Sequence, residues 1–161
     1  MLNLYMRKAF TLVELLVVIS IMAILTIITV SQFRNAKKRA NDVARKGDLN
    51  AVAKALQLYF ADYGKMPAVS EINWGVGFTD GTGYVYMIKL PTENTVGWPQ
   101  YCYKNEGGTS PKKYALFARL EVESDGECEN NNYNCGSVVD GQYCYANVSP
   151  NASLDSNGEF L

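Results

Sequence analysis

The carboxylate of Glu14 is the group in this chain whose position most requires a chemical partner. It precedes an uncharged stretch, residues 15–33, that as a helix is long enough to cross about 28 Å of hydrocarbon. A charged side chain near the end of a membrane-spanning helix is costly unless it is paired. We therefore expect the stretch to span a membrane and Glu14 to bind a positively charged group.

The chain lacks the residue types on which most catalytic sites depend. It contains no histidine, which excludes the commonest general base and the commonest zinc ligand. The sequence shows no nucleophile paired with a base and no glycine-rich phosphate loop. The formal net charge of −1 gives no electrostatic argument for nucleic acid as a partner. The sequence thus favours a structural subunit without a cofactor over an enzyme.

The four cysteines all lie in the C-terminal half of the chain, at Cys102, Cys128, Cys135 and Cys144. An even number of cysteines beyond a membrane span indicates two disulfides in an oxidising compartment, and three pairings are possible. We favour a local bridge between Cys128 and Cys135, which flank the tip of one loop. Cys102 and Cys144 then pair, provided that their strands are neighbours.

The same loop is the candidate site for a metal. Residues 121–140 are rich in acids and asparagines, and Asp125, Glu127 and Asp140 carry the oxygen ligands that Ca²⁺ prefers. The spacing of an EF-hand is absent. A solvated polar loop is the preferred interpretation, and structural calcium is the alternative.

One long helix is predicted to hold Glu14 at its start. Apolar residues recur beyond residue 33 at steps of three and four: Leu49, Val52, Leu56, Tyr59 and Tyr63. Gly64 suits the left-handed position after a helix, and Pro67 prevents its continuation. We expect one helix from Phe10 to Tyr63, apolar all round at first and on one face later. Ala36, Ala40 and Val43 extend a weaker apolar face upstream, with the basic residues on the other side.

The remainder of the chain predicts a small antiparallel sheet. Alternating patterns mark strands at residues 100–104, 113–122 and 142–148. Residues 68–83 are expected to be a connecting loop anchored by Trp74 and Phe78, residues 84–90 suit either helix or strand, and the tail after residue 150 is expected to be loosely held. The fold class is α+β: a long N-terminal helix packed on a small antiparallel sheet, with disulfide-bearing C-terminal loops.

The segment Phe10-Thr11-Leu12-Val13-Glu14, preceded by Lys8-Ala9, resembles the N-terminus of type IV pilins and type II secretion pseudopilins. The resemblance covers residues 7–67, because Leu58 to Pro67 is similar to the helix exit of that family. It implies a pilin fold in four segments. These are a leader (1–9), a hydrophobic membrane and assembly segment (10–33), an amphipathic helical segment (34–64) and a globular head with an αβ loop and the sheet (65–161).

The resemblance also implies how the N-terminus is processed. A membrane-embedded prepilin peptidase cleaves between Ala9 and Phe10 and N-methylates Phe10. Most leaders in the family end in glycine, so Ala9 departs from the pattern, although a small residue still suits a tight protease subsite. The partner of Glu14 is then the amine of Phe10 on a neighbouring subunit. We accordingly expect Glu14 to be unpaired in a single chain.

Three functions are open, in order of preference. The first is the pilin of a type IV pilus, polymerised through its N-terminal helix. The second is the major pseudopilin of a type II secretion system, a type that binds calcium in a comparable C-terminal loop, and the third is a membrane-anchored extracytoplasmic binding domain. The implied partners are other copies of the chain, prepilin peptidase, an inner-membrane platform protein and an assembly ATPase. The implied location is the inner membrane, as a single-pass protein, and then a surface or periplasmic filament.

Overall fold

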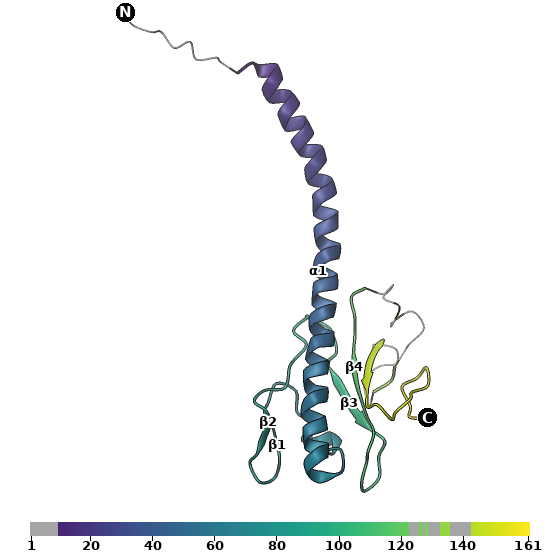
Figure 1. Ribbon diagram of the computed structural model, residues 1–161. Coiled ribbons are helices and arrows are strands. Elements are labelled where there is room, and N and C mark those ends of the chain that lie inside the picture. Colours follow the sequence, from purple (N-terminus) through teal and green to yellow (C-terminus); the bar gives the residue numbers. More distant parts are fainter. Residues whose placement is uncertain (1–9, 123–125, 127, 129–132, 136–142) are drawn as a thin grey trace, which may run out of the picture. The chain divides into compact units, whose positions relative to one another are not determined.

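The computed structural model describes residues 10–122, 126, 128, 133–135 and 143–161, and their side chains outside residues 28–31 (Figure 1). The elements in chain order are α1 (Leu12–Tyr63), the 3₁₀ helix η1 (Val69–Glu71), β1 (Phe78–Thr79), β2 (Val85–Met87), β3 (Cys102–Asn105), β4 (Tyr114–Ala118) and β5 (Tyr145–Val148). The chain forms two compact units, Met1–Lys38 and Arg39–Leu161. The predicted α+β class is confirmed.

The single long helix is confirmed, with a small change at its start. α1 begins at Leu12 because Thr11, one residue before it, acts as the N-cap. It ends at Tyr63, as predicted. Gly64 follows with a φ of 65°, a left-handed conformation that glycine adopts without the steric cost that a Cβ imposes.

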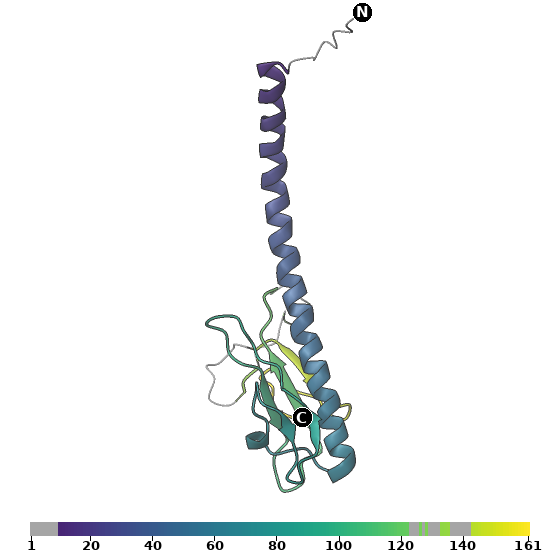
Figure 2. The same cartoon turned by 90° about the vertical axis from the view of Figure 1, so that its left-hand side faces the viewer.

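The strands form two small antiparallel sheets. β3, β4 and β5 lie in that order, with Tyr103 opposite Leu116 and Ala115 opposite Val148. Figure 2 shows these strands beside the C-terminal half of α1. β1 and β2 form a separate hairpin, so the stretch at residues 84–90 contains a strand, and the predicted loop before it contains η1 and β1.

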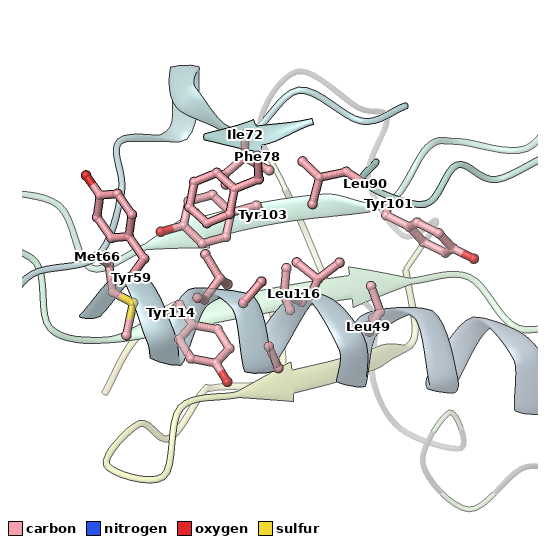
Figure 3. Close-up of a cluster of buried hydrophobic side chains, with 14 of the residues drawn as sticks. Leu49, Tyr59, Met66, Ile72, Phe78, Leu90, Tyr101, Tyr103, Tyr114 and Leu116 are labelled. Carbon is pink, nitrogen blue, oxygen red and sulfur yellow. The ribbon is translucent and has the colours of Figure 1, made fainter. Parts of the chain in front are cut away.

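The main core lies between the C-terminal half of α1 and the two sheets. Leu49, Val52 and Leu56 of α1 are fully buried, and so are Leu116 of β4 and Leu90 of the segment after β2. Figure 3 shows Phe78 and Tyr103 packed between the hairpin and the helix. Burying a side chain of this size stabilises a fold by about 1.5–3 kcal/mol. Phe78 and the half-buried Trp74 are the anchors predicted for this region.

β4 is buried on both faces. Tyr114, Leu116 and Ala118 contact the main core. Ala115 and Phe117 point into a second, smaller core that includes residues of the chain's last segment: Cys135 and Tyr143 are buried there, and Cys102, Tyr133, Ala146, Val148, Leu154 and Phe160 pack against them. The expectation of a loosely held tail was wrong, because this apolar face of β4 needs a cover.

The predicted apolar face of α1 is buried from Leu49 to Tyr59, and its predicted extension before Leu49 was wrong. Ala36, Ala40 and Val43 are all exposed, and the buried residues of this region are Asp42 and Arg45. Tyr63 is 41% exposed because it lies over Tyr59 at a centroid distance of 4.6 Å and does not enter the core. Amphipathic periodicity finds apolar contacts, and it misses an interface made by charged groups.

Two core tyrosines predict how the fold responds to alkali. The Tyr101 hydroxyl donates to Asp48 at 2.9 Å, and the Tyr103 hydroxyl donates to the Pro67 carbonyl at 2.9 Å. Burial raises the pKa of both phenols above the ordinary value, and the neighbouring Asp48 raises that of Tyr101 further. Folding therefore favours the neutral phenols, and their contribution is complete below the unfolded pKa of about 10 and is lost as the pH rises toward the folded pKa.

We expect alkaline unfolding to begin above about pH 10 and to coincide with ionisation of these tyrosines. The measurement is circular dichroism of the full chain in detergent, alongside ultraviolet absorbance of tyrosinate. Tyr103→Phe should shift the unfolding midpoint to higher pH because one penalised ionisation is removed. Complete tyrosine ionisation before any loss of structure would contradict the prediction.

Candidate functional site

The N-terminal end of α1 is closed by a reciprocal pair of hydrogen bonds between Thr11 and Glu14. The Glu14 backbone N–H donates to Thr11 Oγ1 at 3.2 Å, and the Thr11 N–H donates to Glu14 Oε2 at 2.9 Å. The Thr11 hydroxyl also donates to Oε2, at 2.8 Å. This arrangement is a capping box, which satisfies two of the backbone donors that a helix start leaves open.

The expectation that Glu14 is unpaired in a single chain was therefore wrong. Its carboxylate has a partner within its own chain, and that partner is a neutral cap. The acid also lies in the first turn of the helix, where the helix dipole favours negative charge. The cap holds the carboxylate against Thr11, the residue next to Phe10. Among the described residues, no cation forms an ion pair with this carboxylate.

The surface around this carboxylate is apolar and unpartnered. Phe10 is 74% exposed. The large hydrophobic side chains that follow it are also exposed: Leu12, Val13, Leu15, Leu16, Val17, Val18, Ile19, Ile21, Met22, Ile24, Leu25, Ile27 and Phe33. By length and composition this part of α1 is able to cross a membrane. An apolar surface of this extent on a protein requires lipid or another protein as its cover.

Two hydroxyl side chains of this segment bond to its own backbone. The Ser20 hydroxyl donates to the Val17 carbonyl at 2.7 Å, and the Thr26 hydroxyl donates to the Met22 carbonyl at 2.8 Å. Such bonds hide a hydroxyl in an apolar medium and tend to bend a helix. The side chains of Thr29 and Ser31 lie outside the described residues.

Arg45 forms a second polar site, which the sequence did not reveal. It is 4% exposed. Its guanidinium donates to Glu93 at 2.6 Å, to Asp42 at 2.8 Å and to Glu121 at 3.2 Å. The Trp98 ring lies 4.5 Å from its carbon centre. One arginine of α1 thus binds both the segment before β3 and the segment after β4, and we call these residues the Arg45 cluster.

Arg45 and Glu93 of the Arg45 cluster each stabilise the ionised form of the other. Burial alone would lower the pKa of Arg45, but Glu93, Asp42 and Glu121 outweigh it and raise the pKa above its ordinary value. Burial raises the pKa of Glu93, and the hydrogen bonds from Arg45 and Thr95 reverse that effect and lower it. The only sequence signal for this site was the spacing of Asp42 and Arg45, which is also that of an ordinary surface pair.

Both disulfides exist, but the pairing favoured from the sequence was wrong. Cys102 is bonded to Cys135 with Cα atoms 6.3 Å apart, and Cys128 is bonded to Cys144 with Cα atoms 4.6 Å apart. β4 lies between β3, which contains Cys102, and the segment that leads into β5. Positions two strands apart are separated by about 9.6 Å, beyond the reach of a disulfide. Cys102 and Cys144 therefore could not pair.

The candidate calcium ligands Asp125, Glu127 and Asp140 lie outside the described residues. Among the residues that the structure does describe, no group of three or more acidic, cysteine or histidine side chains is placed to hold a metal ion. Asp155, in the last segment, illustrates why an acidic loop is not by itself a metal site. Its carboxylate accepts the backbone N–H groups of Asn157 and Glu159, so it already faces positive dipoles of its own loop.

Comparison with known proteins connects the N-terminal geometry to a family. Residues 5–30, which include Phe10, Thr11 and Glu14, match the family described as the prokaryotic N-terminal methylation motif. The chain carries a prepilin motif. The positions that we predicted for cleavage and methylation, Ala9 and Phe10, fall within this motif, although Ala9 itself lies outside the described residues.

Two curated proteins are similar to this chain. It is 31% identical over 88 residues to type II secretion system core protein G of Pseudomonas aeruginosa, and the matched region covers 55% of this chain and 54% of that protein. It is 44% identical over 55 residues to type IV wide pilus major component PilA4 of Thermus thermophilus, and the matched region covers 34% of this chain and 42% of that protein. The chain spans about half the length of the curated relatives it matches. No solved structure matches.

The relatives are named as a secretion-system component and a pilus component, and neither name is that of an enzyme. They fit both the first and the second function expected from the sequence. The prepilin motif and the apolar helix also fit anchoring in the inner membrane before assembly. The roles of Ala9, Phe10 and Glu14 themselves remain predictions.

Proposed function

We propose that the chain is the structural subunit of a type IV pilus filament. Prepilin peptidase removes residues 1–9 and methylates Phe10, and subunits then leave the inner membrane and bundle through residues 10–33. Residues 34–64 join this bundle to a head formed by residues 65–161. An inner-membrane platform protein and an assembly ATPase drive the transfer.

The observation that carries the proposal is a capped glutamate at the head of an unpartnered apolar helix that lies within a prepilin motif. Exposed apolar side chains have similar free energies in lipid and in a helix bundle, so the transfer between them requires little driving force. The new ammonium of Phe10 and the carboxylate of Glu14 are opposite charges that the apolar bundle would bury. The ammonium of each subunit requires the carboxylate of a neighbouring subunit, and this requirement sets the register of assembly.

The test is mass spectrometry of the mature chain produced with a prepilin peptidase. We expect residues 1–9 to be absent and the new terminus to be N-methylphenylalanine. Ala9→Gly should process at least as well, because glycine is the usual residue in the family, whereas Ala9→Val should block the cut by crowding the subsite. A mature chain that starts at Met1 in a strain with active peptidase would overturn the proposal.

The second candidate is the major pseudopilin of a type II secretion system, favoured by the similarity to core protein G over 88 residues. A pseudopilus is short and periplasmic, whereas a pilus is long and extends from the cell. Electron microscopy at native expression separates the two. Long surface filaments support the pilus, and their absence together with a secretion defect in a deletion strain supports the pseudopilus.

A further inference from the structure

A pocket of about 530 Å³ opens at the C-terminal end of α1 and is used by neither the N-terminal site nor the Arg45 cluster. It is lined by Gln57 and Phe60 of α1, by Met66, by the segment before β4 (Glu106, Lys112 and Lys113), by Tyr114 of β4 and by the turn after β5 (Ser149, Pro150 and Asn151). Met66 and Tyr114 are buried side chains of the main core. The pocket is thus an opening into the core that is bounded by apolar side chains.

The β1–β2 hairpin presents an exposed apolar surface elsewhere on the same unit. Tyr84, Val85 and Ile88 are 60%, 50% and 88% exposed, and we call these three residues the hairpin ridge. Gly77 runs beside Ile88 so closely that a Cβ there would lie 2.9 Å from the Ile88 carbonyl oxygen. Residue 77 is therefore a glycine, because a Cβ would prevent the two backbone segments from lying this close.

The hairpin ridge is held in place by bonds to the helix. Asp80 accepts hydrogen bonds from the Thr82 hydroxyl and the Tyr84 N–H, and the Tyr63 hydroxyl of α1 donates to it at 3.0 Å. The Tyr86 hydroxyl donates to Asp62 of α1 at 2.7 Å. A surface that is both apolar and rigid loses little entropy when it binds.

The charges around the two surfaces have opposite sign. The hairpin is flanked by Asp62, Asp80 and Lys89, a net negative charge. Hydrogen bonds from Thr82 lower the pKa of Asp80 to about 2, so it is ionised at neutral pH. The rim of the pocket carries Lys112, Lys113 and Glu106, a net positive charge. Complementary charge at the rim of an apolar contact favours encounter in one orientation.

The two surfaces face different directions, so a subunit whose hairpin ridge is bound keeps its own pocket free for a further subunit. Figure 1 draws the hairpin and the loop before β4 on opposite sides of α1. A contact between two different patches on identical subunits is heterologous, and repeated it produces a ring or an open helical filament. The geometry of the head is thus of the kind that a filament requires.

We propose that the hairpin ridge of one subunit, led by Ile88, inserts into the pocket beside Tyr114 on the next subunit of the filament. The inference rests on the proposed function, because it assigns a head-to-head contact within that filament. A pocket of this volume also lies within the range of about 300–1,000 Å³ typical of small-ligand sites, so a bound apolar ligand is the competing occupant.

The first test is a photoreactive p-benzoylphenylalanine placed at position 88 of the full chain. In the filament fraction we expect a cross-link between subunits that maps to peptides with residues 57–66, 106–114 or 149–151. The matched control places the same group at Val96, which is 98% exposed and lies outside the hairpin. Cross-links from position 88 to other surfaces, or none in intact filaments, would overturn this contact alone. Wild-type chain that forms no filaments would overturn it together with the pilus and pseudopilus assignments.

The second test uses paired variants with filament yield as the readout. Ile88→Glu and Asn151→Trp should each lower the yield by about tenfold, as expected when a contact of about 1.4 kcal/mol is lost, because one charges the ridge and the other fills the pocket. Val96→Glu and Ser153→Trp place the same side chains at exposed positions outside both surfaces and should leave the yield unchanged. Equal losses in a variant and its control would refute the contact, as would a co-purified apolar ligand with normal filaments from both test variants.

Discussion

Glu14→Gln should leave cleavage and methylation intact and reduce the filament yield by about two orders of magnitude. The amide retains an oxygen that can accept the Thr11 N–H, so the cap at the start of α1 survives. The negative charge is lost, and the ammonium of Phe10 on a neighbouring subunit then has no counter-ion in the apolar bundle. The measurement is the ratio of filamentous to membrane-bound mature chain, with processing followed by mass spectrometry.

The capping box makes the choice of control important. Glu14→Ala would remove the charge and the cap together, so a loss of filaments would not identify the cause. Thr11→Val removes the hydroxyl that accepts the Glu14 N–H and keeps the charge. We expect Thr11→Val to form filaments at a yield within about fivefold of the wild type, because a lost cap costs only about 1 kcal/mol. Normal filaments from Glu14→Gln would exclude the charge pairing.

Arg45→Met should destabilise the unit from Arg39 to Leu161 by about 3–5 kcal/mol. Methionine fills most of the arginine volume, so the loss comes from Asp42 and Glu93, which remain buried as charges without a cation. The expected readout is a lower midpoint of urea unfolding for the full chain in detergent. Arg39→Met, on the same helix at an exposed position, should change the stability by less than about 0.5 kcal/mol.

The pH dependence distinguishes this cause from simple loss of packing. In the wild type, the lowered pKa of Glu93 stabilises the fold above its unfolded pKa, and this contribution is lost as the pH falls through the folded pKa. In Arg45→Met the main cause of the lowering is absent, and burial then raises the pKa of Glu93. The stability difference between variant and wild type should therefore shrink as the pH falls, first through the raised pKa of Glu93 in the variant and then through its lowered pKa in the wild type. A difference that is constant with pH would indicate lost packing instead.

The elements that the sequence predicted well are those whose signals are local. The uncharged stretch after Glu14, the spacing of Leu49 and Leu56, and the Gly64 turn each depend on a few neighbouring residues, and helix α1 agrees with them. The prepilin resemblance is also a local motif. The positions of β3 and β4 followed from alternation for the same reason.

The errors arose where distant segments meet. The pairing of Cys102 required the order of the strands, and alternation along one strand does not contain that order. The roles of Arg45 and of the last segment, which covers Phe117, depended on which surfaces were left open once the sheet had formed. A charged residue on a helix gives the same sequence signal whether it faces water or three carboxylates.

The sequence alone thus determined that an apolar helix begins beside Glu14, within an N-terminal methylation motif, because these properties depend on residue type and near spacing. Tertiary structure decided that Thr11 caps Glu14, that β4 separates Cys102 from Cys144, and that Arg45 joins α1 to the segments around the sheet. Each of these is a three-dimensional contact whose free energy depends on burial and on the positions of groups far apart in the chain. Such contacts exist only after the chain has folded.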